Sequence, residues 1–262
     1  MTNILTAAAL SALSFTYQPD VRTAYLSRGR ISEDRPIQSN LLRMGVSLGD
    51  LGGAGLWHWH FNSLTDRCRD KRDCQFAELD WGVFYNYNLE LAEDWELRSE
   101  VMMRWFTFLF SHEPYKGESD QSMMEYYLEQ SLENPYITPL FRMRRCVHGS
   151  KYAYFRVGAC KQFSLECMDR LEGLTLTPAF YVDFGDDNQR ARYGTRPGGG
   201  DWSSGVMSVL GELTVSYPLN EHFSLYAVLQ QMGVVDKEAR EATHAPYHRD
   251  YTIFTVGAKC RF

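Results

Sequence analysis

Long apolar runs are missing from this sequence of 262 residues, although 44% of the residues are hydrophobic and 14% are aromatic. No stretch approaches the roughly 18 consecutive apolar residues that mark a membrane-spanning helix. The mean hydropathy is negative, so the apolar side chains are interspersed with polar ones and their spacing becomes the main source of information. A single domain accommodates a chain of this length, because closed all-β barrels run to about 200–250 residues without splitting.

An excess of positive charge is also missing, since 27 Lys and Arg residues face 33 Asp and Glu residues, for a net charge of -6. The basic residues do not gather into one stripe, so nucleic acid is not an expected partner. No Ser/His or acid/His pair has the spacing of an activated nucleophile. The Gly198-Gly199-Gly200 run lacks the following helix that a phosphate-binding loop needs. We therefore expect neither an enzyme nor a cofactor.

The sequence is instead rich in period-two alternation, the pattern of half-buried β-strands. From Ala77 to Leu89 the odd positions are apolar and the even positions are mostly polar, whereas a helix of period 3.6 would mix the two sets. The segment around Pro139 is the weakest, so ten strands is the alternative count to twelve. The twelve segments that alternate are residues 21–28, 38–48, 56–62, 77–89, 95–109, 123–133, 136–145, 152–161, 174–184, 205–217, 223–231 and 251–262.

The connections between these segments alternate in length, as they do in transmembrane barrels with short periplasmic turns and longer outer loops. Long connections follow the third, fifth, ninth and eleventh segments, and short ones follow the second, fourth, sixth and tenth. The connection at 147–150 is short where a long one is expected, and the connection after the eighth segment is longer than expected. Most of the pattern favours an up-and-down antiparallel barrel.

Alternation alone does not decide which face of the barrel points inward. A membrane barrel turns its apolar face to lipid and keeps a polar interior, whereas a soluble barrel does the reverse. Aromatic residues near the strand ends match the aromatic girdles of membrane barrels, which favours the membrane barrel over a soluble ligand-binding barrel. These residues are Tyr25, Trp95, Tyr136, Tyr217, Phe223 and Tyr251.

The face predicted to line the lumen carries charges of both signs. Opposite charges on neighbouring strands contribute roughly 0.2–1 kcal/mol each. They would form either a constriction that selects solutes by charge or a set of ion pairs that closes the lumen. The candidate lumen residues are Arg43, His58, His60, Glu78, Asp80, Arg98, Glu100, Arg104, Arg142 and Arg144.

His58 and His60 belong to this prediction on the assumption that Trp57, Trp59 and Phe61 face lipid. Two imidazoles at alternate positions of a strand have the spacing to share a metal ion. No third ligand is visible at a definite spacing, so we interpret them as polar lumen residues and expect no metal site.

The sequence contains six cysteines, an even number that is compatible with an oxidising compartment. Cys68 and Cys74 bracket a short charged segment and are the candidates for a small disulfide, because their spacing does not suit zinc. Residues 1–15 have the length and small-residue content of an export signal but lack its basic start. We interpret them as a signal remnant or disordered N-terminus before a single barrel domain, 16–262, with the beginning of the first strand as the alternative.

The last strand, from Tyr251 to Phe262, resembles the C-terminal strand of bacterial outer-membrane β-barrel proteins. The terminal Phe262 is preceded by Ala258, Val256 and Phe254 on the same face, although Cys260 departs from the pattern. The resemblance implies that Phe254, Val256 and Phe262 are part of an assembly signal read by the outer-membrane assembly machinery. It also implies a location in the bacterial outer membrane.

A second resemblance lies near the front of the chain. Tyr25-Leu26-Ser27-Arg28-Gly29, followed by Pro36-Ile37-Gln38, is similar to the first hairpin of an uncharacterised family of exported barrel proteins.

Together these features predict an all-β, closed antiparallel transmembrane barrel of about twelve strands in the lipid bilayer. We expect a narrow porin-like channel for small solutes. The alternative is a structural or adhesive barrel with a blocked lumen and ligand-binding outer loops, and conductance separates the two.

Overall fold

A computed structural model describes residues 13–262 apart from 34, 65–75, 111–121, 150, 166–171, 194 and 243–249. The elements are β1 (Leu13–Arg22), β2 (Tyr25–Ser27), β3 (Arg30–Glu33), β4 (Ile37–Ser47), the 3-10 turn η1 (Gly49–Leu51), β5 (Gly53–Ser63), β6 (Phe76–Ala92), β7 (Trp95–Phe110), β8 (Ser122–Glu133), β9 (Thr138–His148), β10 (Ala153–Cys160), β11 (Phe163–Ser164), β12 (Thr175–Gly185), α2 (Asp187–Ala191), β13 (Gly205–Pro218), β14 (Phe223–Val234), α3 (Lys237–Glu241) and β15 (Tyr251–Arg261). No helix in the described part of the chain is long and apolar enough to cross a membrane.

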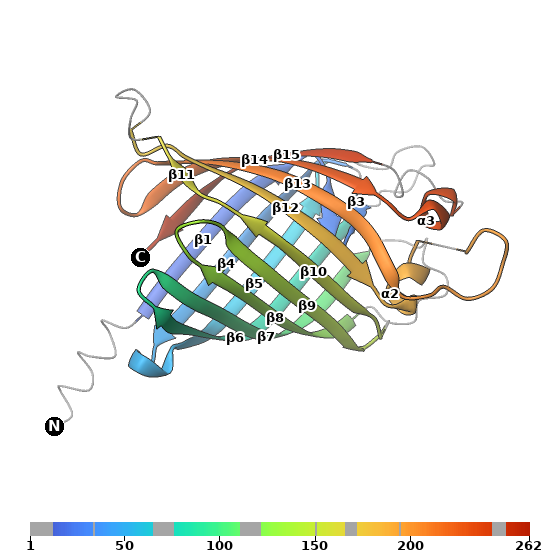
Figure 1. The fold of residues 1–262 in the computed structure, drawn as a ribbon, viewed down its shortest axis with the longest axis horizontal. Coiled ribbons are helices and arrows are strands. Elements are labelled where there is room, and N and C mark those ends of the chain that lie inside the picture. Colours follow the sequence, from blue (N-terminus) through green and yellow to red (C-terminus); the bar gives the residue numbers. More distant parts are fainter. Residues whose placement is uncertain are drawn as a thin grey trace.

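Twelve of these strands form one closed antiparallel barrel (Figure 1). Each strand pairs with its neighbour in the chain, with β11 as a short extra strand on β12, and β1 closes the ring by pairing with β15. The predicted count of twelve and the up-and-down order are confirmed, and the ten-strand alternative is excluded. The segment containing Pro139 is a full wall strand, β9.

The start of β1 and the C-terminus lie at one end of the barrel, here called the turn end (Figure 1). The opposite end, called the loop end, carries α2 and α3. The predicted alternation of connection lengths is present, including the short β9 to β10 connection at the loop end and the longer β10 to β12 connection at the turn end. In transmembrane barrels the end with the short turns is the periplasmic one.

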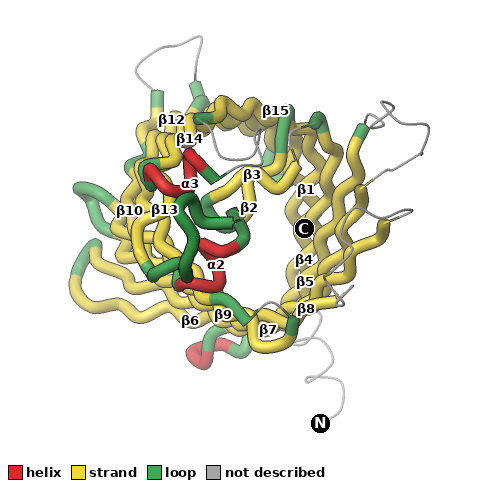
Figure 2. Tube along the Cα trace, turned by 90° about the vertical axis from the view of Figure 1, so that its right-hand side faces the viewer, coloured by secondary structure: helices red, strands yellow, loops and turns green. Residues whose placement is uncertain are grey.

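The first wall strand differs from the prediction of a strand over 21–28. β1 runs from Leu13 to Arg22, so it also includes residues assigned to the N-terminal segment 1–15. Residues 1–12 lie outside the described part of the chain. Tyr25–Ser27 instead pairs with Arg30–Glu33 as a separate two-stranded hairpin, β2 and β3, and Figure 2 shows this hairpin inside the ring of wall strands. The alternating pattern did not distinguish the two because Tyr25 and Ser27 are buried inside the barrel as a wall residue would be.

The outer face of the barrel is apolar. On β6, Trp81 has 53% of its surface exposed while the preceding Asp80 has 2%, and Val83 and Tyr85 continue the exposed row. The same order holds on β12, where Phe180 is 56% exposed and Asp183 is fully buried. A soluble barrel would turn these faces the other way, so this wall is built to contact lipid.

Candidate functional site

The hairpin of β2 and β3 turns through two residues in the left-handed region, Arg28 with φ 52° and Gly29 with φ 75°. Glycine is required at the second position for a further reason. A Cβ on Gly29 would lie 3.0 Å from the Ser208 hydroxyl and 3.1 Å from Cβ of Asp183. The tip of the hairpin therefore rests directly against the inner wall formed by β12 and β13.

Backbone carbonyl groups at this tip accept hydrogen bonds from side chains at the loop end of the barrel. The Gly29 carbonyl accepts hydrogen bonds from the Ser208 hydroxyl at 3.0 Å and from the Tyr193 hydroxyl at 3.2 Å. The Arg28 carbonyl accepts one from the Gln189 side-chain amide at 3.0 Å. Buried carbonyl groups need such partners, so the hairpin occupies a prepared position in the lumen.

The side chain of Arg28 anchors the hairpin to a second part of the wall, three strands away from β12. Its Nε donates to Glu125 on β8 at 2.9 Å, and its guanidinium lies 4.8 Å from the centre of the Phe106 ring and 5.3 Å from that of Tyr152. Glu125 is fully buried and also accepts from Arg104 and, at 2.7 Å, from the Tyr152 hydroxyl. Removing one partner of a buried ion pair typically costs about 3–5 kcal/mol, so this carboxylate is the main fixed point of the site.

A second buried carboxylate lies beneath the hairpin tip. Asp183 accepts two hydrogen bonds from Arg156, at 2.7 and 3.0 Å, and one from the Tyr154 hydroxyl at 2.6 Å. The Ser208 hydroxyl, which bridges to Gly29, also donates to it at 3.0 Å. The two carboxylates thus hold the hairpin from β8 and from β12.

Several charged groups around Glu125 are not fully paired. Arg144 forms no ion pair within the described residues and lies over the rings of Tyr127 and Tyr154. Buried polar atoms without a hydrogen-bond partner in the described protein include Arg28 Nη2, Arg104 Nε, Arg144 Nε, Glu78 Oε1 and Asp80 Oδ1. Such groups are costly unless they are hydrogen-bonded, so this level of the lumen is suited to water and to polar solutes.

The remaining side of the hairpin packs on apolar side chains of the wall. Tyr25 lies 5.2 Å from the ring of Trp59 and 4.8 Å from that of Phe61, and Trp57 and Ile37 belong to the same buried cluster. Trp57, Trp59 and Phe61 therefore point inward, against the prediction.

His58 and His60 consequently lie on the outer face, and their assignment to the lumen was wrong. His58 pairs across strands with Trp81, and their rings lie 4.2 Å apart on the lipid side. The physical reason is the hairpin itself, because an apolar surface inside the barrel requires an apolar inner face on the wall strand that it contacts.

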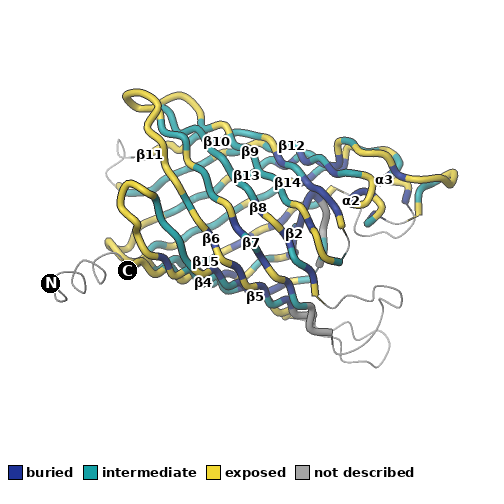
Figure 3. Tube along the Cα trace, turned by 90° about the horizontal axis from the view of Figure 1, so that it is seen from below, coloured by how far each residue is buried: buried dark blue, intermediate teal, exposed yellow. Residues whose placement is uncertain are grey.

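Towards the turn end the wall residues are mostly intermediate or exposed, whereas buried residues gather towards the loop end (Figure 3). Arg43 donates to Glu100 at 2.5 Å and lies 4.2 Å from the ring of Phe84. A cavity of about 500 Å³ adjoins them, with Ser14, Thr16, Asn86 and Asn88 among its lining residues. Small polar groups and the Arg43 side chain thus border a cavity large enough for a small solute.

The other predicted lumen residues lie on the same inner face. Arg142 donates to Glu129 at 2.6 Å, and Arg98 donates to Glu96 at 2.9 Å. Arg98 also lies 3.6 Å from Glu133 at the turn end. Glu78, Asp80, Arg104 and Arg144 surround the hairpin anchor described above. The predicted set, apart from the two histidines, is therefore divided between the hairpin level and the turn end.

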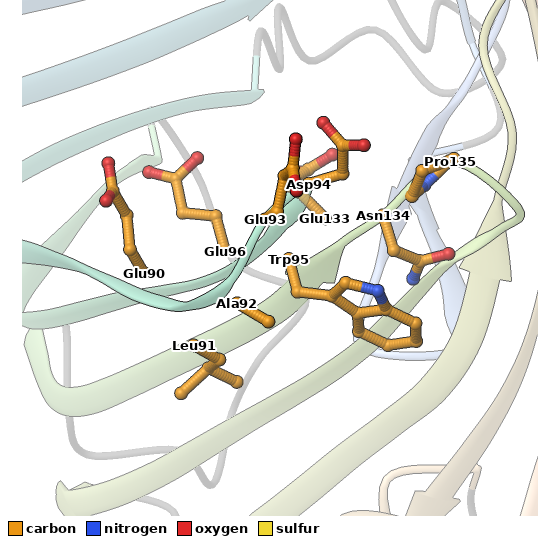
Figure 4. A pocket seen from close by; sticks show the side chains of 10 residues that line it. All are labelled: Glu90, Leu91, Ala92, Glu93, Asp94, Trp95, Glu96, Glu133, Asn134 and Pro135. Atoms are coloured by element: carbon orange, nitrogen blue, oxygen red, sulfur yellow. The ribbon is translucent and has the colours of Figure 1, made fainter.

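A cavity of about 810 Å³ lies at the rim of the turn end, between the β6 to β7 and β8 to β9 turns. Figure 4 shows the carboxylates of Glu93, Asp94 and Glu133 close to one another there, beside Trp95. Glu96 pairs across strands with both Glu90 and Glu133, so this rim is acidic.

Sequence reasoning missed part of the site. Arg156, Asp183 and Tyr152 were not singled out, although the first two occupy polar positions in alternating segments. Gln189 and Tyr193 come from a connecting loop, where no periodic signal exists. The described residues contain no group of three or more potential His, Cys, Asp or Glu metal ligands, and Cys68 and Cys74 lie outside them.

At the C-terminus, Phe254, Val256 and Phe262 all point outward, with exposed fractions of 48%, 46% and 59%. The Phe262 ring lies 5.8 Å from Phe223 and 5.1 Å from His222. The predicted apolar stripe is therefore present, and its role in assembly stays a prediction.

No protein-family profile matches the sequence, and no curated protein matches it. Among solved structures, an outer-membrane channel from Pseudomonas putida aligns over 96% of each chain with a TM-score of 0.55 and 8% identity. The KdgM porin aligns with a TM-score of 0.48 and 10% identity, over 95% of this chain and 99% of its own. The translocator domain of the autotransporter NalP from Neisseria meningitidis gives 0.49 and 10%, over 100% and 96%. The fold is thus that of outer-membrane barrels, and the family with the Tyr-x-Ser-Arg-Gly hairpin is not confirmed.

Proposed function

We propose that this protein is an outer-membrane channel for small polar solutes, in which the β2 and β3 hairpin forms the constriction. The observation that carries the proposal is the anchoring of Arg28 to the buried Glu125 across the lumen, at 2.9 Å. A hairpin anchored to β8 and β13 inside the ring of strands narrows the lumen at this level.

The polar groups at this level support passage of small hydrophilic molecules. Unpaired donor atoms of Arg104 and Arg144 and acceptor atoms of Glu78 and Asp80 lie in the same region. A solute that donates and accepts hydrogen bonds can replace the water it loses there. The charges of both signs also give the constriction a means of selecting ions.

The test is single-channel recording of the refolded chain in a planar lipid bilayer. The wild type is compared with Glu125→Gln, which removes the charge that holds Arg28, and with Glu129→Gln as a matched control. Glu129 lies on the same strand and loses the same charge, but its hydrogen-bond partners among the described residues are Arg142 and Tyr127 of the wall. We expect small discrete conductance steps in the wild type. Glu125→Gln should give larger or noisier steps and altered ion selectivity, because the hairpin is released and Arg28, Arg104 and Arg144 lose their counter-charge.

The arginines of the lumen offer a second pair of variants for the same recording. Arg104→Ala should shift selectivity towards cations, whereas Arg98→Ala, whose side chain is 53% exposed at the turn end, should have a smaller effect. Heat-dependent migration on a gel shows whether the chain is folded. A folded chain that carries no current would rule out the channel.

The dense packing of the loop end favours a second candidate, a blocked barrel whose outer loops bind a ligand. Buried residues are concentrated at that end (Figure 3). The loop after α2, the helix α3 and the hairpin meet there in one apolar cluster that includes Tyr193, Trp202, Met207 and Ala239, with Leu26 packed against it. Conductance that stays absent in both the wild type and Glu125→Gln would favour this function.

A further inference from the structure

Four polar side chains form a continuous hydrogen-bonded row on the outer, lipid-facing surface of β1, β4 and β5. The Tyr17 hydroxyl donates to Oδ1 of Asn40 at 2.8 Å, and Nδ2 of Asn40 lies 3.1 Å from Nε2 of His60. Nδ1 of His60 lies 3.3 Å from Nε2 of His58, and Nδ1 of His58 lies 2.9 Å from the carbonyl of Asp80. We call Tyr17, Asn40, His58 and His60 the outer polar row.

One proton arrangement satisfies the whole row. If each histidine is neutral and carries its proton on Nδ1, every donor faces an acceptor from Tyr17 through to the Asp80 carbonyl. The row therefore needs no charge. The row can still form further hydrogen bonds, because one N–H of Asn40 and the oxygen lone pairs of Tyr17 are not used in these contacts. Gln38 and Asn62, which pair across strands beside the row, are exposed.

The row interrupts an apolar part of the outer belt. The wall positions in register with it are apolar: Leu42 beside Tyr17, Pro19 beside Asn40, and Leu79 and Trp81 beside the two histidines. Towards the turn end, β4 and β5 continue with Met44 and Leu56, both exposed. Lipid chains offer no hydrogen-bond partners to the free capacity of the row, so a polar strip in this position is better covered by protein.

We propose that the outer polar row is the contact surface between two copies of this chain in the membrane. The chemistry of the strip identifies the occupant. It contains amide, imidazole and phenol groups, each of which both donates and accepts, so the strip complements itself about a two-fold axis. No Lys or Arg points outward among the described residues of β1, β4 and β5, which disfavours a lipid phosphate, and the absence of outward carboxylates there disfavours a basic partner.

The experiment measures self-association of the refolded full chain in two ways, by sedimentation equilibrium in density-matched detergent and by energy transfer between labelled copies in liposomes. The test variant is Asn40→Leu/His58→Leu/His60→Leu. The matched control is Gln130→Leu on β8, which also replaces an outward polar side chain but lies three strands from β5. We expect a dimer for the wild type and the control, and association at least about tenfold weaker for the triple variant, since several interfacial hydrogen bonds are lost together.

A wild type that stays monomeric at all concentrations, or a triple variant that associates like the wild type, would overturn the proposal. Dissociation of the wild-type dimer by EDTA would also overturn it, because the histidine pair would then act through a bound metal. Heat-dependent migration verifies that each variant is folded. If the triple variant does not fold, Asn40→Leu alone should still weaken association, because it removes the only amide of the row.

Discussion

Gly29 and Arg28 show how two adjacent residues position the hairpin. Gly29 provides a positive φ and room for the inner wall, while Arg28 carries the charge that reaches Glu125. The hairpin tip is therefore fixed by backbone and side chain together, and either contribution can be tested alone.

Gly29→Ala should lower the free energy of unfolding by more than the roughly 1–2 kcal/mol that the left-handed conformation costs any other residue. The added methyl group would meet Ser208 and Asp183. Gly198→Ala is the control, because Gly198 has φ 81° but nothing within 4 Å of the added Cβ. Urea unfolding in detergent should show a larger loss for Gly29→Ala, and equal losses would mean that the hairpin does not press on the wall.

The histidines illustrate what sequence can and cannot determine at this scale. Alternation correctly separated His58 and His60 from Trp57, Trp59 and Phe61, because a strand has two faces. It could not say which face is inside, since that depends on Tyr25 of a hairpin distant in sequence. By contrast, Glu78 and Asp80, which were also assigned to the lumen, lie on the buried inner face of β6.

Among the elements, the two long loops at the loop end are joined by ion pairs. Arg190, in α2, pairs with Asp236 just before α3, and both side chains are almost fully buried. Arg196 makes two hydrogen bonds to Glu238, at 2.9 and 2.7 Å, nearer the surface. These contacts hold α2 and α3 together over the hairpin.

The Arg196–Glu238 pair, which lies nearer the surface, should make the stability of the α3 loop depend on pH in the acid range. Hydrogen bonding from Arg196 holds the pKa of Glu238 below its usual value of 4.5. A lowered carboxylate pKa stabilises the folded loop at any pH above the usual pKa of the group. This stabilisation is lost as the pH falls through the lowered pKa. Amide hydrogen exchange in α3 should therefore be slower in the wild type than in Glu238→Gln at pH 7, and the two should converge in acid. Glu241→Gln is the control, because it removes an exposed charge of the same helix that pairs with Lys237 and not with Arg196 among the described residues. An equal change in it would contradict the assignment.

The wall strands were predictable because each has a lipid face and a lumen face, and that contrast is visible in the sequence. The hairpin was not, because β2 and β3 are short and lie wholly inside, where Tyr25 and Ser27 mimic a wall strand. Alternation therefore merged the hairpin with β1. The closing strand, which carries Phe254, Val256 and Phe262, was predicted within a residue.

At the scale of the whole molecule, the ring is sealed where its two ends meet. Phe15 and Phe262 exchange backbone hydrogen bonds of 2.8 and 2.9 Å, and their rings lie 6.4 Å apart. Next to this contact the outer face of the seam is apolar, with Leu13, Phe15 and Phe262 exposed.

Phe262→Ala should reduce the amount of folded barrel in cells, because the resemblance to outer-membrane proteins implies that the assembly machinery reads this residue. The measurement is the heat-modifiable fraction in outer-membrane preparations. Refolding of the same variant in detergent separates recognition from stability. Phe163→Ala, an exposed aromatic in β11, is the control. Normal cellular assembly of Phe262→Ala would remove this role.

The pairing of β1 with β15 also constrains the order in which the barrel can assemble. The first and last strands of the barrel are each other's neighbours, so a partly assembled barrel has no continuous wall and leaves two bare strand edges open to aggregation. The hairpin is made early, yet its anchors lie 97 residues away at Glu125 and 179 residues away at Ser208. The segment from Arg28 to Ser208 must therefore be exported before the hairpin can be anchored in the lumen. We expect the pairing of β1 with β15 to close the barrel last.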